Sequence, residues 1–134
     1  TTVIANNDRA TRIQLAQSRV AMRKPAQGKA AASDLSLWLN QHPRDATAWL
    51  VQASAFELQG DALRAIRAQA EARAMELDYS AAVDRFKAAQ LLAHQMASEG
   101  KLDRAGHMEA SIIDARLRDL ERLRREQALE RGIN

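Results

Sequence analysis

The chain has 134 residues, of which 46% are apolar, 28% are charged and 4% are aromatic, and it contains no cysteine. This balance is typical of one globular domain with a single core, and it excludes disulfides as well as disordered and collagen-like classes. The formal net charge of +3 is small, and no apolar run approaches the roughly 20 residues that cross a bilayer, so we expect neither a nucleic-acid binder nor a membrane span.

Residues that start or stop helices divide the chain into six predicted helices. Asp and Ser side chains accept hydrogen bonds from the free N–H groups of a helix start, whereas Pro and Gly interrupt or end a helix. The six helices are predicted at about residues 8–23, 25–41, 46–59, 61–77, 80–98 and 103–131. Ser80 is the predicted cap of the fifth helix. Gly28 and Gly60 are interpreted as turn glycines beside helix ends. Because Ala is abundant and β-branched residues are scarce, the expected fold is all-α.

A period of 34 residues relates the first two pairs of helices. Connections of two to five residues force neighbouring helices to pack antiparallel, which predicts a stack of helical hairpins. Residues of matching size recur 34 positions apart, as Leu15 with Trp49, Met22 with Phe56, and Ala31 with Ala65. We expect the large residues to wedge between the two helices of a hairpin, and the small residue to let the helices approach closely.

The phase of this repeat changes after Gly60. The run 78–83, followed by Phe86 and Ala89, has the pattern of a second helix displaced by half a period from Ala65. The fourth predicted helix should therefore contact both the third and the fifth. The last helix should cap the open end of the stack with an apolar stripe, formed by Ile113, Leu117, Leu120 and Leu123.

Residues 12 to about 94 resemble tetratricopeptide repeats. The resemblance is carried by the 34-residue spacing, Pro43 at the end of the first unit, Trp49 in the second, and Ala82, Phe86 and Ala89 in the third. It implies antiparallel helical hairpins stacked as a short tetratricopeptide-like α-solenoid of about six helices, with a long C-terminal capping helix. Repeats of this type serve many partners, so the resemblance implies a fold rather than a function.

A narrower resemblance covers the second half of the chain. Its segments are Ala46–Asp61, Ala70–Ala72, Asp78–Val83 and Glu109–Leu117. They are similar to the C-terminal region of bacterial zinc metallopeptidases that join an HExxH catalytic domain to tetratricopeptide repeats, the type that includes the β-barrel assembly-enhancing protease. The resemblance implies that residues 1–134 are one domain excised from the C-terminal part of a larger chain, that the parent's peptidase domain holds zinc, and that the protein is periplasmic or membrane-associated. Thr1–Ala5, which carry no initiator Met and no leader, fit an excised piece.

The chain itself offers no set of residues suited to catalysis. His42, His94 and His107 lack a second ligand at the spacing that places two metal ligands on one helical turn, and no HExxH motif is present. There is no Cys nucleophile, no Gly-rich phosphate loop and no Ser at a strand-to-helix elbow. We therefore expect this chain to be no enzyme by itself, with no catalytic residue, metal or cofactor of its own.

A binding surface is predicted on the first helix of each hairpin, which lines the concave side of a helical stack. In the phase fixed by Leu15 and Trp49, the candidate residues for protein binding are Val20, Arg23, Lys24, Leu50, Ser54, Glu57, Leu58, Arg64, Arg67 and Glu71, with Ile13, Ala16 and Thr47 in the same phase. The set is mixed in polarity and lacks the basic clamp that grips a terminal carboxylate. For Val20, Leu50 and Leu58 a core position is the favoured alternative, because apolar residues at helical spacing are usually buried.

Three functions are weighed; in the first, the residues indicate the scaffold and only the family resemblance implies the peptidase. The first is a non-catalytic scaffold that recruits or positions protein substrates or assembly partners for an attached zinc metallopeptidase. The second is a free-standing helical adaptor or dimerisation module unrelated to proteolysis. The third is a basic helical RNA binder, which intermixed charges such as Arg122 with Glu126 disfavour. Partner identity and oligomeric state are not determined by the sequence.

Overall fold

The computed structural model describes residues 8–132, so Thr1–Ala5 lie outside the described residues. Six helices follow one another in the chain, and no strand occurs between residues 8 and 132. They are α2 (Arg9–Ala21), α3 (Pro25–Gln41), α4 (Ala46–Leu58), α5 (Ala62–Met75), α6 (Tyr79–Ser98) and α7 (Arg104–Glu130). The predicted all-α fold is confirmed, and most predicted helix ends lie within two residues of the observed ones.

Aspartates precede five of these helices, and four of them cap the helix with their side chains; Asp8, before α2, makes no such bond. The side chains of Asp45, Asp61, Asp78 and Asp103 each accept a hydrogen bond from the backbone N–H three residues later, at 2.7 to 3.2 Å. Each bond satisfies one of the N–H groups that a helix start leaves unpaired. The prediction that Ser80 caps the fifth helix is wrong, because Asp78 holds the cap and Ser80 lies inside α6.

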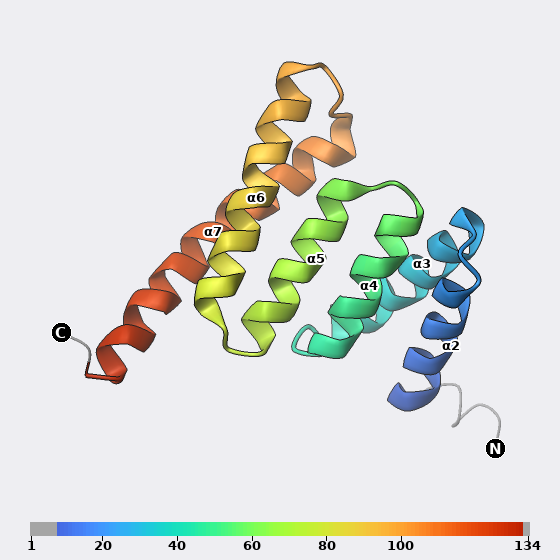
Figure 1. Ribbon diagram of the computed structural model, residues 1–134, viewed down its shortest axis with the longest axis horizontal. Helices are drawn as coiled ribbons and strands as arrows, with labels where there is room; N and C mark the ends of the chain where they lie inside the picture. Colours follow the sequence, from blue (N-terminus) through green and yellow to red (C-terminus); the bar gives the residue numbers. More distant parts are fainter. Residues whose placement is uncertain (1–7, 133–134) are drawn as a thin grey trace.

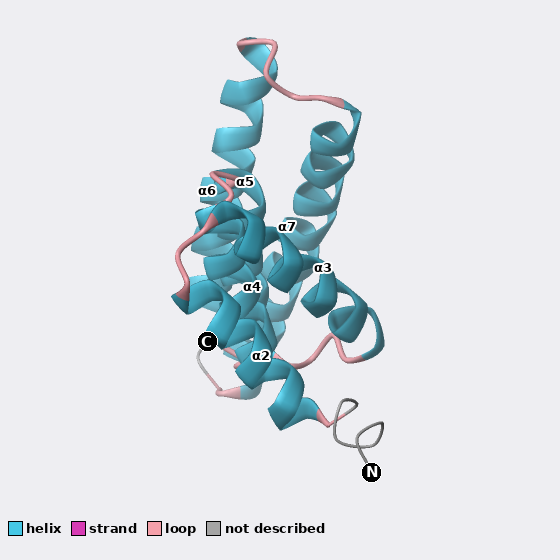
Figure 2. Ribbon diagram, turned by 90° about the vertical axis from the view of Figure 1, so that its right-hand side faces the viewer, coloured by secondary structure: helices cyan, strands magenta, loops and turns pink. Residues whose placement is uncertain are grey.

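Each helix packs against the next one in the chain, as the short connections predict. α2 also contacts α4, and α5 also contacts α7. In Figure 1, α4, α5 and α6 lie side by side, with α3 behind α4 and α7 passing behind α6. Figure 2 shows α3 and α7 on the same side of that layer. The α5 helix contacts both α4 and α6, which confirms its two predicted partners.

The buried apolar side chains form two clusters rather than the single core that composition predicts. The α2–α4 cluster includes Ile13, Leu35 and Val51, and the α5–α7 cluster includes Val83 and Phe86. The stripe of α7 belongs to the second cluster: Ile113, Leu117 and Leu120 are buried, and Leu123 packs against them. Buried alanines that belong to neither cluster lie on α4 and α5, the helices that join the two: Ala53, Ala65, Ala68 and Ala72.

The 34-residue repeat correctly predicts that its recurring alanine is buried. Its prediction that the recurring large residues are buried holds only in part. Ala31 and Ala65 are both buried, and Trp49 and Phe56 pack against the α2–α4 cluster. In α2, however, Leu15 and Met22 are 45% and 51% exposed, so the expectation that they wedge between helices is wrong. The buried face of α2 instead contains Ile13, which lies two residues, or about 200° of helical rotation, from Leu15.

Gly28 marks a close helix crossing rather than a turn. It lies inside α3, and a Cβ placed on it would be 2.9 Å from the carbonyl oxygen of Ala55 and 2.9 Å from Cβ of Leu58. Only a residue without a side chain lets α3 approach α4 this closely. Gly60 does fit the turn interpretation, because its φ of 74° after α4 is left-handed. Among the described residues, no helix has the length and apolar character needed to span a membrane.

Candidate functional site

The predicted binding residues lie on two sides of the molecule rather than on one continuous surface. Those of α2 and α4 border two adjoining hollows between these helices, here called the α2–α4 hollows. Those of α5, which are Arg64, Arg67 and Glu71, instead contact α7. The two sides are separated by α4. Ser54 faces the hollows, whereas Gln52 and Phe56, each two residues or about 200° of helical rotation away, face the side of α5 and α7.

The α2–α4 hollows are shallow and of similar size. One, of about 390 Å³, is lined by Val20, Ala21, Arg23, Ser54, Glu57 and Leu58. The other, of about 380 Å³, is lined by Gln17, Val20, Ala21, Thr47, Leu50, Val51 and Ser54. Seven of the predicted residues, Thr47 among them, therefore come together here. Ile13 and Ala16 do not, because they are buried in the α2–α4 cluster. Lys24 lies beside Arg23 in the loop before α3.

The walls of these hollows combine apolar surface with charged side chains, and two neighbouring cations form no ion pair within residues 8–132. Leu50 is 42% exposed, while Val20 and Leu58 are half-buried. Arg23 and Lys24 are exposed, and neither forms an ion pair within residues 8–132. Glu57, by contrast, accepts a hydrogen bond from Nε2 of Gln69 at 3.0 Å. The arrangement can hold apolar side chains of a partner and attract acidic ones.

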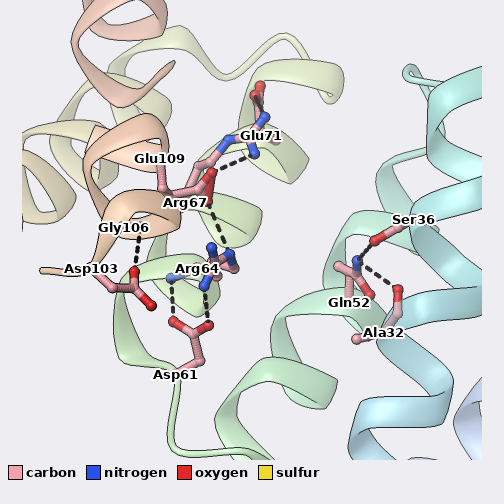
Figure 3. A network of polar contacts seen from close by, with 10 residues as sticks. All are labelled: Ala32, Ser36, Gln52, Asp61, Arg64, Arg67, Glu71, Asp103, Gly106 and Glu109. Atoms are coloured by element: carbon pink, nitrogen blue, oxygen red, sulfur yellow. Dashed lines mark hydrogen bonds and ion pairs between the residues drawn. The ribbon is translucent and has the colours of Figure 1, made fainter. Parts of the chain in front are cut away.

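On the other side, α5 and α7 are joined by a network of arginines and buried carboxylates (Figure 3). Arg67 donates through Nη1 to Glu109 at 3.1 Å and through Nη2 to Glu71 at 3.3 Å. Arg116 donates to both carboxylate oxygens of Glu71, the shortest bond being 2.8 Å. A hydrogen bond to Asp61 raises the pKa of Arg64, against the opposing effect of burial. The network holds the first half of α7 against α5.

Glu71 is therefore not a surface residue. Only 3% of it is exposed, and both of its carboxylate oxygens accept hydrogen bonds from arginines. The expectation that it points toward a partner does not fit this position. Arg64 and Arg67 are partly exposed, but their guanidinium groups are paired with acids of α5 and α7.

Between α3 and α7 lies a smaller polar pocket of about 200 Å³, whose floor is α4 and α5. We call it the α3–α7 groove. Its lining residues are Ser36, Leu39, Asn40, Trp49, Gln52, Phe56, Arg64, Arg67, Ala68 and Glu109. The Arg67 guanidinium lies over the Trp49 ring, 5.4 Å from its centroid.

Three residues of this region escaped prediction from the sequence. Gln52 has the largest polar side chain in the mostly apolar stretch from Ala46 to Phe56, and this was the available signal. Glu109 and Arg116 look like ordinary members of the charged α7 surface, since many acids and arginines alternate there. Along α7, the predicted pair of Arg122 and Glu126 does form, at 3.0 Å, and Asp114 accepts a hydrogen bond from Nε2 of Gln90.

The histidines and a hollow beside the α3–α4 loop offer no metal or catalytic site among the described residues. The ring of His42 stacks on Trp38 with centroids 3.9 Å apart, and His94 and His107 are exposed. Within residues 8–132, no group of three or more His, Cys, Asp or Glu residues is placed to hold a metal ion. A hollow of about 590 Å³ adjoins Asp45 at the α3–α4 loop. Hydrogen bonds from Arg9 lower the pKa of Asp45 to about 2, with Trp38 and Ala48 acting in the same direction.

Comparison with known proteins gives no relative from which a function could be transferred. Neither the scan of family models nor the searches of curated proteins and of solved structures found a match for this chain. The resemblance to repeats attached to zinc metallopeptidases therefore stays a prediction. What this chain binds has to be inferred from the α2–α4 hollows and the α3–α7 groove.

Proposed function

We propose that this chain is a non-catalytic protein-interaction scaffold whose α2–α4 hollows hold a segment of another polypeptide. Following the sequence resemblance, we further propose that the scaffold recruits or positions protein substrates or assembly partners for an attached zinc metallopeptidase. In that arrangement zinc and the catalytic residues belong to the peptidase domain, and this chain contributes binding alone.

One observation carries the proposal: two adjoining hollows with mixed apolar and polar walls include Arg23, a cation without an ion pair in residues 8–132, and Lys24 follows it in the chain. Val20, Leu50 and Leu58 offer apolar surface that a partner's side chains can cover. Arg23 and Lys24 add positive charge, and neither forms an ion pair with an acid within residues 8–132. The hollows are framed by helices that already pack against each other, so binding requires little ordering of the scaffold.

Photo-crosslinking tests the position of the site. A photoreactive amino acid replaces Ser54, which lines both hollows, and a matched one replaces Leu91, which is 69% exposed on α6 and lines neither. We expect position 54 to form adducts with a defined protein, identified by mass spectrometry, and Leu50→Asp to abolish them. Identical adducts from positions 54 and 91 would contradict the proposal.

Charge reversal tests the role of the two cations. Arg23→Glu with Lys24→Glu should slow association with the crosslinked partner roughly tenfold at low salt and weaken the dependence of the rate on ionic strength. Arg85→Glu with Lys87→Glu changes net charge by the same amount on exposed positions of α6 and should leave the rate nearly unchanged. Equal slowing by both pairs would show that only net charge matters.

The link to a peptidase has a separate test. The coding sequence upstream of residue 1 should encode an HExxH motif, and deletion of residues 8–132 from the full protein should impair cleavage of the protein substrate but not of a short peptide. If no such motif precedes this chain, the free-standing adaptor becomes the better proposal, and the binding role of the α2–α4 hollows is unaffected.

A further inference from the structure

We propose that Arg23 selects the segment held in the α2–α4 hollows by pairing with an acidic side chain of that segment. The inference rests on the proposed function and names the chemistry of the partner, which presents an apolar side chain and, about 10 Å along the hollows, a carboxylate. The backbone conformation of Arg23, its place in the hollows and its lack of an ion pair each support the assignment.

The first observation is the left-handed backbone after α2. Five residues between 8 and 132 have a positive φ; each lies two residues beyond the end of a helix and donates its N–H to the carbonyl oxygen three residues earlier. Three of them are Gly60, Gly100 and Gly132, as expected where a Cβ would clash. The exceptions are Arg23, with a φ of 55°, and Leu77, with a φ of 64°. Both carry a steric cost that glycine avoids.

The two exceptions differ in their surroundings. Arg23 lines one of the α2–α4 hollows beside Glu57 and Leu58, whereas Leu77, which is 62% exposed, lines neither hollow. The Arg23 side chain makes no ion pair or hydrogen bond within residues 8–132. No polar contact of the described chain therefore offsets the cost of its backbone, and a carboxylate of a partner can do so.

The helix geometry of α4 sets the distance between the apolar and the charged contact. Both hollows include Val20 and Ser54, so they adjoin along α4. Leu50 lines one hollow, and Glu57, seven residues later, lines the hollow that contains Arg23. Seven residues of an α-helix span about 10 Å. A segment that fills both hollows therefore places its carboxylate about three residues from its apolar side chain if it is extended, or about seven if it is helical.

Glu57 determines which charge a partner should carry. It is the one acid among the described residues that line the hollows, and it already accepts a hydrogen bond from Nε2 of Gln69 at 3.0 Å. The guanidinium of Arg23 is uncommitted and can donate two parallel hydrogen bonds to one carboxylate. Lys24 is exposed beside it and adds attraction without that paired geometry. The hollow therefore favours a partner acid over a partner cation.

Peptide selection tests this chemistry. Random peptides of about 12 residues, long enough for the helical spacing, are displayed on phage and selected on the 134-residue chain. Peptides that Leu50→Asn loses are taken as occupants of the hollows, because this neutral change removes apolar surface without adding charge. We expect these peptides to share an Asp or Glu at the stated spacing from an apolar residue. Replacing that acid by its amide should weaken binding roughly tenfold in fluorescence polarisation.

Two glycine variants separate a role in binding from a role in the fold. Arg23→Gly and Leu77→Gly both remove the steric cost of the left-handed backbone, so each should raise the melting temperature by about 2–4 °C. Arg23→Gly should weaken binding of the selected peptides roughly tenfold, whereas Leu77→Gly should change it less than about twofold. Arg23→Lys keeps the charge but not the paired donors, so it should recover part of the affinity. Glu57→Gln should strengthen binding about twofold, because it removes a like charge.

Four outcomes would overturn the inference. Occupants of the hollows that lack an acid, or that bind Arg23→Gly as tightly as the wild type, would do so and leave the proposed function standing. Weaker binding to Glu57→Gln would show that the partner presents a cation. A melting temperature that falls for Arg23→Gly but rises for Leu77→Gly would show that contacts within the fold retain the arginine. If Leu50→Asn loses no peptide, the inference fails, and crosslinking at position 54 decides separately whether the proposed function stands.

Discussion

At the scale of single residues, Asp45 connects three helices through one carboxylate. Oδ2 accepts from Nε of Arg9 at 2.7 Å and from Nε1 of Trp38 at 2.9 Å, and Oδ1 accepts from Nη2 of Arg9 at 2.8 Å. Oδ1 also caps α4 through the N–H of Ala48. Arg9 belongs to α2 and Trp38 to α3, so the carboxylate sits where the ends of α2, α3 and α4 meet.

Because the hydrogen bonds from Arg9 lower the pKa of Asp45 from 3.8 to about 2, the ionised form stabilises the fold. This contribution is complete above the unfolded-state pKa near 4 and is lost as the pH falls toward 2. Asp45→Asn keeps a capping oxygen but removes the charge, so it should lower the free energy of unfolding at pH 7 by about 1–2 kcal/mol, a value reduced by the exposure of Arg9. Urea unfolding of the wild type and of Asp45→Asn at pH 7 and pH 2 gives the free energy of unfolding of each. If acidification lowered it equally in both, the stabilising role of the ionised Asp45 would be contradicted.

Glu71 shows the same dependence on distant partners. Its side chain is 4% exposed and bonds to Arg116, which is 45 residues away in the chain. A double-mutant cycle with Glu71→Gln and Arg116→Gln should give a coupling energy of about 1–3 kcal/mol in urea unfolding.

The exposed pair Arg122 and Glu126 is the control for that cycle, since each side chain is 53% exposed. Its coupling should be only about 0.3–0.5 kcal/mol, because water screens the charges. Similar values for the two pairs would mean that burial does not strengthen the Glu71 interaction.

At the scale of helices, the α3–α4 crossing depends on a residue without a side chain. Gly28→Ala would place Cβ 2.9 Å from the backbone oxygen of Ala55, which can move only with α4 itself. The gain in helix propensity is about 1 kcal/mol, and overpacking costs about 1–3 kcal/mol, so we expect a net loss of up to about 2 kcal/mol.

Gly106→Ala is the matched comparison within another helix. There the nearest atom to the new Cβ, at 2.8 Å, is Cδ2 of Leu102, which ends a flexible side chain and can rotate away. Thermal unfolding should therefore show an unchanged or slightly raised melting temperature for Gly106→Ala, where the gain in helix propensity also applies, and a clear decrease for Gly28→Ala. Equal melting temperatures for the two variants would argue against a tight α3–α4 crossing.

The helices themselves were largely predictable from local signals. Pro25 and Gly60, together with Asp45 and Asp61, act within one helical turn, so their effect can be recognised without knowledge of the fold. Which face of a helix is buried was harder to predict. In α2 the apolar residues Ile13 and Leu15 lie about 200° apart, and only contact with α3 and α4 decides between them.

At the scale of the whole molecule, two apolar clusters share one continuous stack of helices. Ile13 belongs to the α2–α4 cluster and Ile113 to the α5–α7 cluster. Ile13→Val and Ile113→Val should each lower the free energy of unfolding by about 0.5–1.5 kcal/mol, and the double variant should lose the sum because the sites share no neighbours. Since α4 and α5 pack together, urea should give one transition. Two transitions, each sensitive to one substitution, would instead show two independently unfolding halves.

The whole-molecule arrangement also explains why the predicted binding residues were divided. Extending the repeat phase from α4 into α5 assigned Arg64, Arg67 and Glu71 to the surface of Leu50 and Ser54. The stack instead adds α6 and α7 on the far side of α5, and α7 brings Glu109 and Arg116 onto these residues. The groove that results is built from four helices, so no single segment carries its pattern.

The amino-acid sequence alone determined the helical class, the ends of the helices and the apolar stripe of α7, because caps, prolines and helical periodicity act over a few residues. Only the tertiary structure decided that Glu71 is buried, that Leu15 is exposed, and that Gln52 and Arg67 share a groove. These outcomes depend on how helices cross, and the residues concerned meet partners up to 45 positions away. Side-chain contacts at that separation are set by packing geometry, which local sequence does not contain.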